Sequence, residues 1–265
     1  MPPDPAHATA RAALHPRLRS VAAVVCDTDG VLLDSARLHA AAWQRAFDTT
    51  LRERPPADPA QRRPFDPDEE YRRLVDGRSR VDGAAAFLAA RGLHLPRGRP
   101  DAAPGSDTVW AVAARKDREF TALVAEEGVT ALPGSLPMLR ALRRAGVPCV
   151  AVSASRHAEE LLVAAGVRPL LTDVVDGREA ARLNLPGKPD PALFHQATRR
   201  LGVPPHRAAL VEDALAGVTA GRRGGFRPVV GVVGGGGAPV AARLRRHGAD
   251  LVVRDLAELL TEPEE

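Results

Sequence analysis

Two acidic residues, Asp27 and Asp29, follow directly on an apolar segment of strand-forming residues that begins at Val21. Gly30 comes next and allows the backbone to turn sharply after the second acid. A buried strand with this ending delivers both carboxyl groups to the carboxyl edge of its sheet, where open parallel sheets bind their ligands. A strand that ends in an Asx turn is the alternative interpretation of the same residues.

Two further strand ends supply polar groups of the kind that phosphoryl transfer needs. Ser153 follows a predicted strand and precedes Ala154 and Ser155. Its hydroxyl and the backbone N–H groups that enter the next helix can hold phosphate oxygens, although an ordinary helix N-cap has the same appearance. Lys188 stands before another predicted helix, where a compact cation can neutralise charge on a nucleophile and a phosphate. Arginine supplies all but two of the 37 basic residues, which favours a function for Lys188 over a solvated surface position.

Glu212 and Asp213 end a third apolar segment. With Asp27 and Asp29 they place four carboxylates at one edge of the expected sheet. Each like-charge pair at ~4 Å would cost about 4 kcal/mol at an effective dielectric constant near 20. A divalent cation removes this repulsion, and oxygen ligands together with a phosphate substrate favour Mg²⁺.

The elements that position these groups alternate between strand and helix from Pro133 onward, which predicts an α/β fold with a doubly wound, Rossmann-like parallel sheet. A first strand leads to Asp27. The later strands are expected at 147–152, 171–175, 208–211, 228–233 and 250–253, and the helices between them at 135–145, 156–165, 190–201, 214–223 and 239–247.

The first strand is separated from the rest of the sheet by an inserted helical segment. We expect a poorly ordered or extended N-terminal arm over residues 1–20, an α/β core from 21–35 and 131–265, and a helical domain over 36–130. Five prolines make 55–67 a loop. The helices of the insert are expected at 36–54, 68–75, 82–91 and 107–127. Gly234 to Gly237 lacks the spacing of a dinucleotide fingerprint and is interpreted as a flexible loop.

The amino-acid composition argues against a nucleic-acid-binding, a disulfide-bonded and a membrane-spanning protein. The net charge of +4 is dispersed, and aromatic residues make up only 3% of the 265 residues, so stacking platforms for nucleic acid are nearly absent. Cys26 and Cys149 lie in apolar strand-like segments and are interpreted as buried free thiols. No apolar run reaches the ~20 residues that a membrane span needs, and the N-terminus lacks a signal-peptide core. We therefore expect a cytoplasmic protein that binds neither nucleic acid nor membrane.

The pattern Asp27-x-Asp29-Gly-Val-x-x-Asp-Ser35 resembles the first motif of the haloacid dehalogenase superfamily, and Ser153, Lys188 and the Glu212-Asp213 pair match its other three in order and spacing. Thr28 departs from the usual apolar residue, but its side chain is expected to point away from the acids. The resemblance implies that Asp27 is a nucleophile that forms an aspartyl phosphate and that Asp29 is the general acid and base. Ser153 and Lys188 would hold the phosphoryl group. Mg²⁺ would be held by Asp27, the Asp29 carbonyl, Glu212 and Asp213.

Within the superfamily the sequence is most similar to the β-phosphoglucomutases. The segment from Tyr71 to Gly83 is similar to the cap loop by which that family holds the phosphate that is not transferred, and Arg80 is the residue carried over for this contact. His39 and Trp43 match residues that couple cap closure to the acid–base residue and line the sugar pocket. Plain structural roles remain open for all three: Arg80 as a surface residue, His39 as a helix residue and Trp43 as core.

The resemblance implies Mg²⁺-dependent phosphoryl transfer on a small sugar phosphate, as in β-phosphoglucomutase, which interconverts β-glucose 1-phosphate and glucose 6-phosphate. A phosphatase that hydrolyses small phosphomonoesters would use the same residues and stays open as the alternative. We expect a monomer or a weak homodimer.

Overall fold

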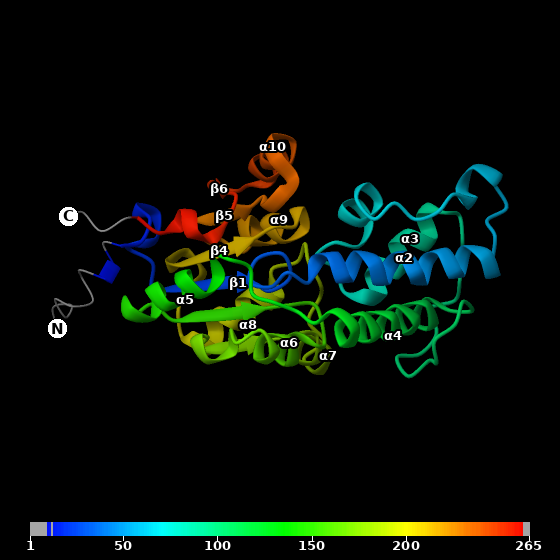
Figure 1. The fold of residues 1–265 in the computed structure, drawn as a ribbon, viewed down its shortest axis with the longest axis horizontal. Helices are drawn as coiled ribbons and strands as arrows, with labels where there is room; N and C mark the ends of the chain where they lie inside the picture. The colour runs from blue at the N-terminus through cyan, green and yellow to red at the C-terminus, as the bar shows by residue number, and fades with distance from the viewer. Residues whose placement is uncertain (1–9, 12, 262–265) are drawn as a thin grey trace. The chain divides into compact units, whose positions relative to one another are not determined.

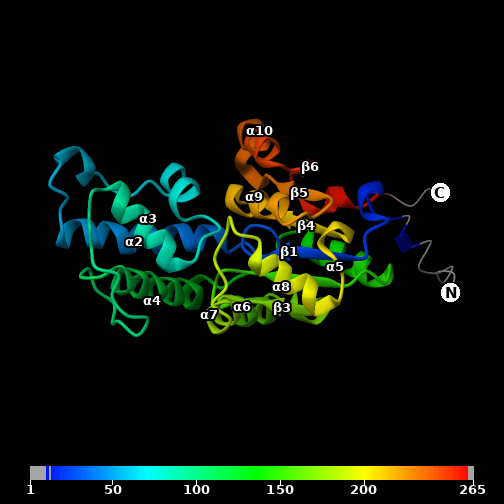
Figure 2. The same cartoon turned by 180° about the vertical axis from the view of Figure 1, so that it is seen from behind.

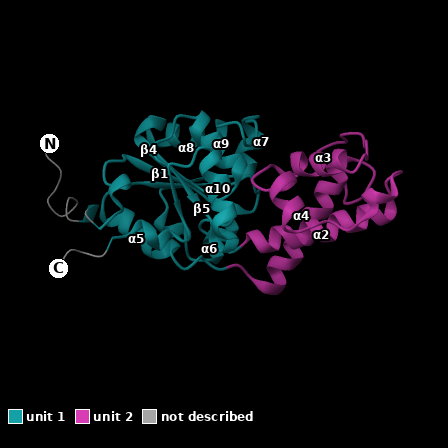
Figure 3. Ribbon diagram, turned by 90° about the horizontal axis from the view of Figure 1, so that it is seen from above, with its two compact units in different colours: residues 1–34, 130–265 teal, residues 35–129 magenta. Residues whose placement is uncertain are grey.

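The structure is a computed structural model that describes residues 10, 11 and 13–261. The chain divides into two compact units, one formed by residues up to Asp34 and from Thr130 onward, the other by Ser35–Val129 (Figure 3). Among the described residues, no helix is long and apolar enough to cross a membrane.

Unit 1 is built on a parallel sheet of six strands in the order β3-β2-β1-β4-β5-β6 (Figure 1). β1 lies at the centre, and its residue Asp27 is the register partner of Val152 in β2. The chain moves outward from β1 in both directions, so the predicted doubly wound α/β fold is confirmed. The strands are β1 (Ala23–Asp27), β2 (Cys149–Val152), β3 (Asp173–Val175), β4 (Ala208–Glu212), β5 (Val229–Val232) and β6 (Leu251–Val253).

Helices follow the strands and bury the apolar faces of the sheet. On one face, side chains of three helices form a single core cluster with alternate residues of the strands, such as Val25 and Leu210. Phe194 and Phe226 lie in this cluster and are fully buried. The helices of unit 1, labelled in Figure 1 or Figure 2, are α5 (Ser135–Arg144), α6 (Ala158–Ala164), α7 (Gly177–Arg182), α8 (Ala192–Leu201), α9 (Leu215–Arg223) and α10 (Gly237–His247); α8, α9 and α10 contribute to the cluster.

One local expectation for unit 1 is wrong. No helix was expected between β3 and Lys188, yet α7 forms there because the Asp176 side chain accepts hydrogen bonds from the N–H groups of Arg178 and Glu179. The helix expected over about 156–165 is present as α6, which begins at Ala158.

The described part of the N-terminal segment packs against the rest of unit 1. Leu14 and Leu18 are completely buried, and Leu14 forms an antiparallel bridge with Leu260. From Leu14 onward the segment is therefore not the poorly ordered arm that the composition suggested, because two leucines among its prolines and arginines enter the core. Residues 1–9 and 12 of the expected arm lie outside the described residues.

Unit 2 is helical, with α2 (Ala36–Glu53), α3 (Arg80–Ala90) and α4 (Val109–Glu127) packed around Phe47 and Phe87. The expected helix over 68–75 is a π-helical turn at Tyr71–Val75, and the last helix is capped by Thr108 rather than opened by Asp107. Arg91 is buried and links the end of α3 to other parts of unit 2. It donates hydrogen bonds to the Glu70 carboxylate at 2.7 Å and to three backbone carbonyls of the proline-rich loop.

Candidate active site

Asp27, the last residue of β1, is buried and held by hydrogen bonds. The backbone N–H of Asp29 donates to Oδ2 of Asp27 at 3.0 Å. The turn after it is possible because Gly30 has a φ of +76°, in the region that favours glycine. The Thr28 side chain points to the neighbouring strand, where its hydroxyl donates to the Val152 carbonyl at 3.2 Å. The Thr28 hydroxyl therefore adds a hydrogen bond to β2 that an apolar side chain at this position could not make.

Ser153 lies beside the second acid. Its hydroxyl donates to Oδ2 of Asp29 at 3.0 Å and accepts a hydrogen bond from the Ser155 N–H, also at 3.0 Å. The N-cap of α6 is His157, so Ser153 is not a helix N-cap, and the alternative interpretation is wrong. Ala154 lies in this turn and packs close to Gly177, where a Cβ atom would meet the Ala154 carbonyl at 2.4 Å. The turn thus brings Ser153 to Asp29.

Lys188 is a buried cation between two carboxylates. Its Nζ donates to Oδ1 of Asp27 and to Oε1 of Glu212. Glu212 is fully buried, and its other oxygen accepts from the Ala214 N–H at 2.6 Å. A solvated surface position for Lys188 is therefore excluded.

Burial and the neighbouring charges both shift the pKa values of Asp27 and Lys188. Burial raises the pKa of Asp27 well above its usual range, Lys188 lowers it, and Glu212 and Asp29 raise it again. Burial would lower the pKa of Lys188, but the carboxylates of Asp27 and Glu212 raise it above its ordinary value, so Lys188 stays charged. One lysine does not neutralise the surrounding acids, and a further cation would relieve the repulsion that remains.

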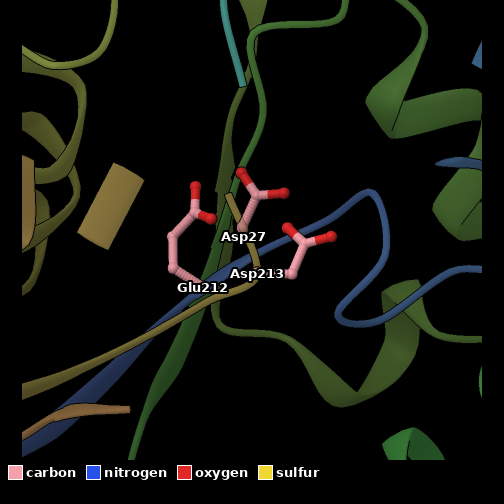
Figure 4. A group of neighbouring side chains, drawn as sticks. All are labelled: Asp27, Glu212 and Asp213. Atoms are coloured by element: carbon pink, nitrogen blue, oxygen red, sulfur yellow. The ribbon is translucent and has the colours of Figure 1, made fainter. Parts of the chain in front are cut away.

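Asp27, Glu212 and Asp213 can each offer a carboxylate oxygen such that the three atoms lie within 4.8 Å of one another (Figure 4). An all-oxygen set of this kind fits a hard divalent cation such as Mg²⁺. Asp29 is outside this group.

Two glycines leave room for the acids: a Cβ at Gly30 would lie 2.0 Å from Oδ2 of Asp213, and one at Gly217 would lie 1.9 Å from Oε1 of Glu212. The close approach of Gly217 was missed in the sequence, where nothing distinguishes it from a helix glycine.

Gly30→Ala is expected to reduce both stability and metal binding. A non-glycine residue in the left-handed region costs roughly 1–2 kcal/mol, and the added methyl group would displace Asp213. Gly202 provides a control, because its φ of +64° imposes the same strain while nothing lies within 4 Å of an added Cβ. Denaturant unfolding should show a similar loss in the free energy of unfolding for both alanine variants. A titration of activity with Mg²⁺ should show that only Gly30→Ala raises the Mg²⁺ concentration needed for half-maximal activity. An equal Mg²⁺ requirement in the two variants would contradict the assignment of Asp213.

The residues expected to act from the helical insert have well-defined contacts within unit 2. Trp43 is buried in the core of the unit and stacks on Phe47, with ring centroids 4.6 Å apart. Trp43 therefore occupies a core position, which was one of the two roles that the sequence left open. A role in lining a sugar pocket stays a prediction.

His39 is part of a buried pair that sequence reasoning missed. Its Nδ1 lies 2.7 Å from Nζ of Lys116, and its ring stacks on Phe120 with centroids 4.0 Å apart. Lys116 is the other lysine of the chain, so the rarity of lysine was the one sequence signal that could have drawn attention to it.

Arg80 is the first residue of α3 and is mostly covered. Its Nη1 lies 2.8 Å from Oδ2 of Asp117, and its guanidinium lies over the Trp110 ring, 5.9 Å from the centroid. Arg80 is therefore held in place by Asp117, a partner that the sequence did not indicate.

The fold and the site together define an α/β protein whose central strand ends in a candidate centre for phosphoryl transfer. Comparison with known proteins agrees with this class. The sequence profile of the haloacid dehalogenase-like hydrolases matches residues 21–225. A β-phosphoglucomutase of Mycobacterium bovis is 42% identical over 240 residues, which cover 91% of this chain and 92% of the relative. The chain therefore belongs to the haloacid dehalogenase superfamily, is β-phosphoglucomutase-like, and is a phosphotransferase or hydrolase.

Two other proteins show the range of this family. A haloacid dehalogenase family hydrolase from Deinococcus radiodurans, whose crystal structure contains phosphate and sodium, is 31% identical with a TM-score of 0.61 and coverage of 91% of this chain and 93% of its own. A validoxylamine A 7'-phosphate phosphatase of Streptomyces hygroscopicus is 27% identical over 88% of this chain and 93% of its own length. The relatives thus include both a mutase and a phosphatase.

Proposed function

We propose that this enzyme transfers the phosphoryl group of a small sugar phosphate through an aspartyl phosphate on Asp27, most like a β-phosphoglucomutase. The observation that carries the proposal is the placement of Asp27, which is bonded to Lys188 and lies beside Glu212 and Asp213. The M. bovis relative supports the choice of substrate class.

The chemistry follows from the groups around Asp27. An oxygen of its carboxylate attacks phosphorus, and the bond from phosphorus to the ester oxygen of the substrate breaks. Asp29 gives its proton to that leaving oxygen and takes a proton from the acceptor in the second half-reaction. The N–H of Asp29 orients Asp27, and the Ser153 hydroxyl orients Asp29. Lys188 offsets charge on the transferring group.

Mg²⁺ fits the oxygens of Asp27, Glu212 and Asp213, with the Asp29 carbonyl as a further ligand implied by the family. When bound, it would supply positive charge that screens the acids from the incoming phosphate. We propose that Arg80 binds the phosphate that is not transferred, since a guanidinium can bind phosphate through two parallel hydrogen bonds.

A phosphatase remains the second candidate, and the pairing of Arg80 with Asp117 favours it. A distal phosphate would have to compete with a carboxylate that already holds the guanidinium at 2.8 Å. In a phosphatase, water rather than a second sugar oxygen would accept the phosphoryl group.

Arg80→Ala is expected to separate the two functions. Loss of a charge-assisted contact costs about 1.5–3 kcal/mol, so interconversion of β-glucose 1-phosphate and glucose 6-phosphate should fall roughly ten- to a hundredfold. Hydrolysis of acetyl phosphate, which has no second phosphate, should change little. Arg73→Ala, which alters an exposed arginine of the preceding π-helical turn, is the matched control and should leave both activities unchanged. The mutase proposal fails if the wild type releases phosphate from glucose phosphates faster than it interconverts them, or if Arg80→Ala lowers both activities equally.

A further inference from the structure

The Lys188 ammonium has a third neighbour besides its two carboxylates. Its Nζ lies over the Phe194 ring, 5.0 Å from the centroid. Phe194 is fully buried in the first turn of α8, the helix that begins shortly after Lys188. A desolvated ammonium at this distance from an aromatic face is attracted by the quadrupole of the ring.

We propose that Phe194 is a positioning residue for phosphoryl transfer, because its ring supports the Lys188 ammonium on the core side of the site. The proposal rests on the proposed function for the role of Lys188. Asp27 and Glu212 now hold the ammonium, but the same two carboxylates are expected to serve as nucleophile and metal ligand. Lys188 must therefore redirect hydrogen bonds toward phosphate oxygens during the reaction. An uncharged ring keeps the ammonium in place while this happens, since it competes neither for the metal nor for the phosphoryl group.

Phe226 offers a matched control within the same core. It is also fully buried, and its ring packs edge-on against Phe194 with centroids 6.0 Å apart. Within the described part of the chain, no lysine or arginine lies over its ring. Substitution of either phenylalanine by leucine removes a similar packed ring, but only Phe194→Leu removes the contact with Lys188.

The contact can be measured without any assay, because the chain contains only two lysines, Lys116 and Lys188. Enzyme labelled with ¹³C at the lysine ε-carbon should give two signals, assigned with Lys188→Met. The Lys188 ε-protons should be shifted upfield by the ring current of Phe194, and Phe194→Leu should remove this shift while Phe226→Leu retains it. Lys116, which lies over Phe120, is an internal reference. A Lys188 signal that Phe194→Leu does not move would overturn the proposal.

The effect on chemistry is measured by the rate at which acetyl phosphate phosphorylates the enzyme. Phe194→Leu should lower this rate about 5- to 30-fold, the span from an exposed to a desolvated cation–π contact. Phenylalanines with increasing fluorination at position 194 should lower it in graded steps, which a purely structural role would not produce. The same series at position 226 should leave it constant.

A double-mutant cycle links the two residues. On a Lys188→Met background, Phe194→Leu should have no further effect on the rate. If Lys188→Met itself has no effect, the proposed function fails, and the lysine signal still decides whether the contact exists. If Lys188→Met impairs the enzyme but the fluorinated series is flat, only the positioning role of Phe194 is lost.

Discussion

Asp27→Asn is expected to lower turnover of any phosphate substrate by at least a factor of about a thousand, as loss of a catalytic nucleophile does in other enzymes. The amide has nearly the shape of the carboxylate, and its single oxygen can still accept one of the two hydrogen bonds that Lys188 and the Asp29 N–H donate to separate oxygens of Asp27. It cannot attack phosphorus, so catalysis is lost while the fold is retained. Steady-state kinetics and thermal unfolding of the purified variant would measure both effects.

Asp101→Asn is the control for this experiment, because Asp101 is an exposed acid of unit 2 that pairs with the exposed Arg99. It should leave turnover unchanged. Near-normal turnover by Asp27→Asn would show that another group accepts the phosphoryl group.

Removal of the metal is expected to have the second-largest effect. Exhaustive chelation with EDTA should abolish turnover, and added Mg²⁺ should restore it, because the repulsion among Asp27, Glu212 and Asp213 would otherwise oppose an incoming phosphate. Asp213→Asn should raise the Mg²⁺ concentration for half-maximal activity at least about tenfold, since loss of even an outer-shell partner weakens metal binding by that much. A magnesium titration of activity measures this shift.

Asp101→Asn again serves as the control and should titrate like the wild type. Full activity after chelation would exclude a metal-dependent reaction. An unchanged titration for Asp213→Asn would exclude this particular acid as a ligand.

The sequence was most informative where a buried strand ends. Asp27, Ser153 and Glu212 each follow an apolar segment, and parallel strands bring their carboxyl ends to one edge, so strand pattern alone predicts that these residues meet. Lys188 was found because lysine is rare in this chain. The sheet could be predicted for the same reason, since its strands are continuous runs of buried residues.

The sequence was least informative where a polar residue finds its partner far along the chain. Arg80 and Asp117 belong to different helices, and neither has a local pattern that marks the pair. Trp43 has the helical spacing of a core residue and of a pocket residue alike; its stacking on Phe47 shows the core contact, and the pocket role stays a prediction. Leu14 and Leu18 were obscured by the prolines and arginines around them, although both are completely buried and Leu14 pairs with Leu260.

The most direct test of the central claim is to locate the phosphoryl group on the enzyme. Wild-type enzyme exposed to acetyl phosphate, quenched in acid and mapped by mass spectrometry should carry phosphate on the peptide that contains Asp27. The modification should be removed by hydroxylamine, as an acyl phosphate is, and it should be absent from Asp27→Asn. Substrate turnover with phosphate on a different residue, or with no phosphoenzyme at any stage of the reaction, would contradict the account.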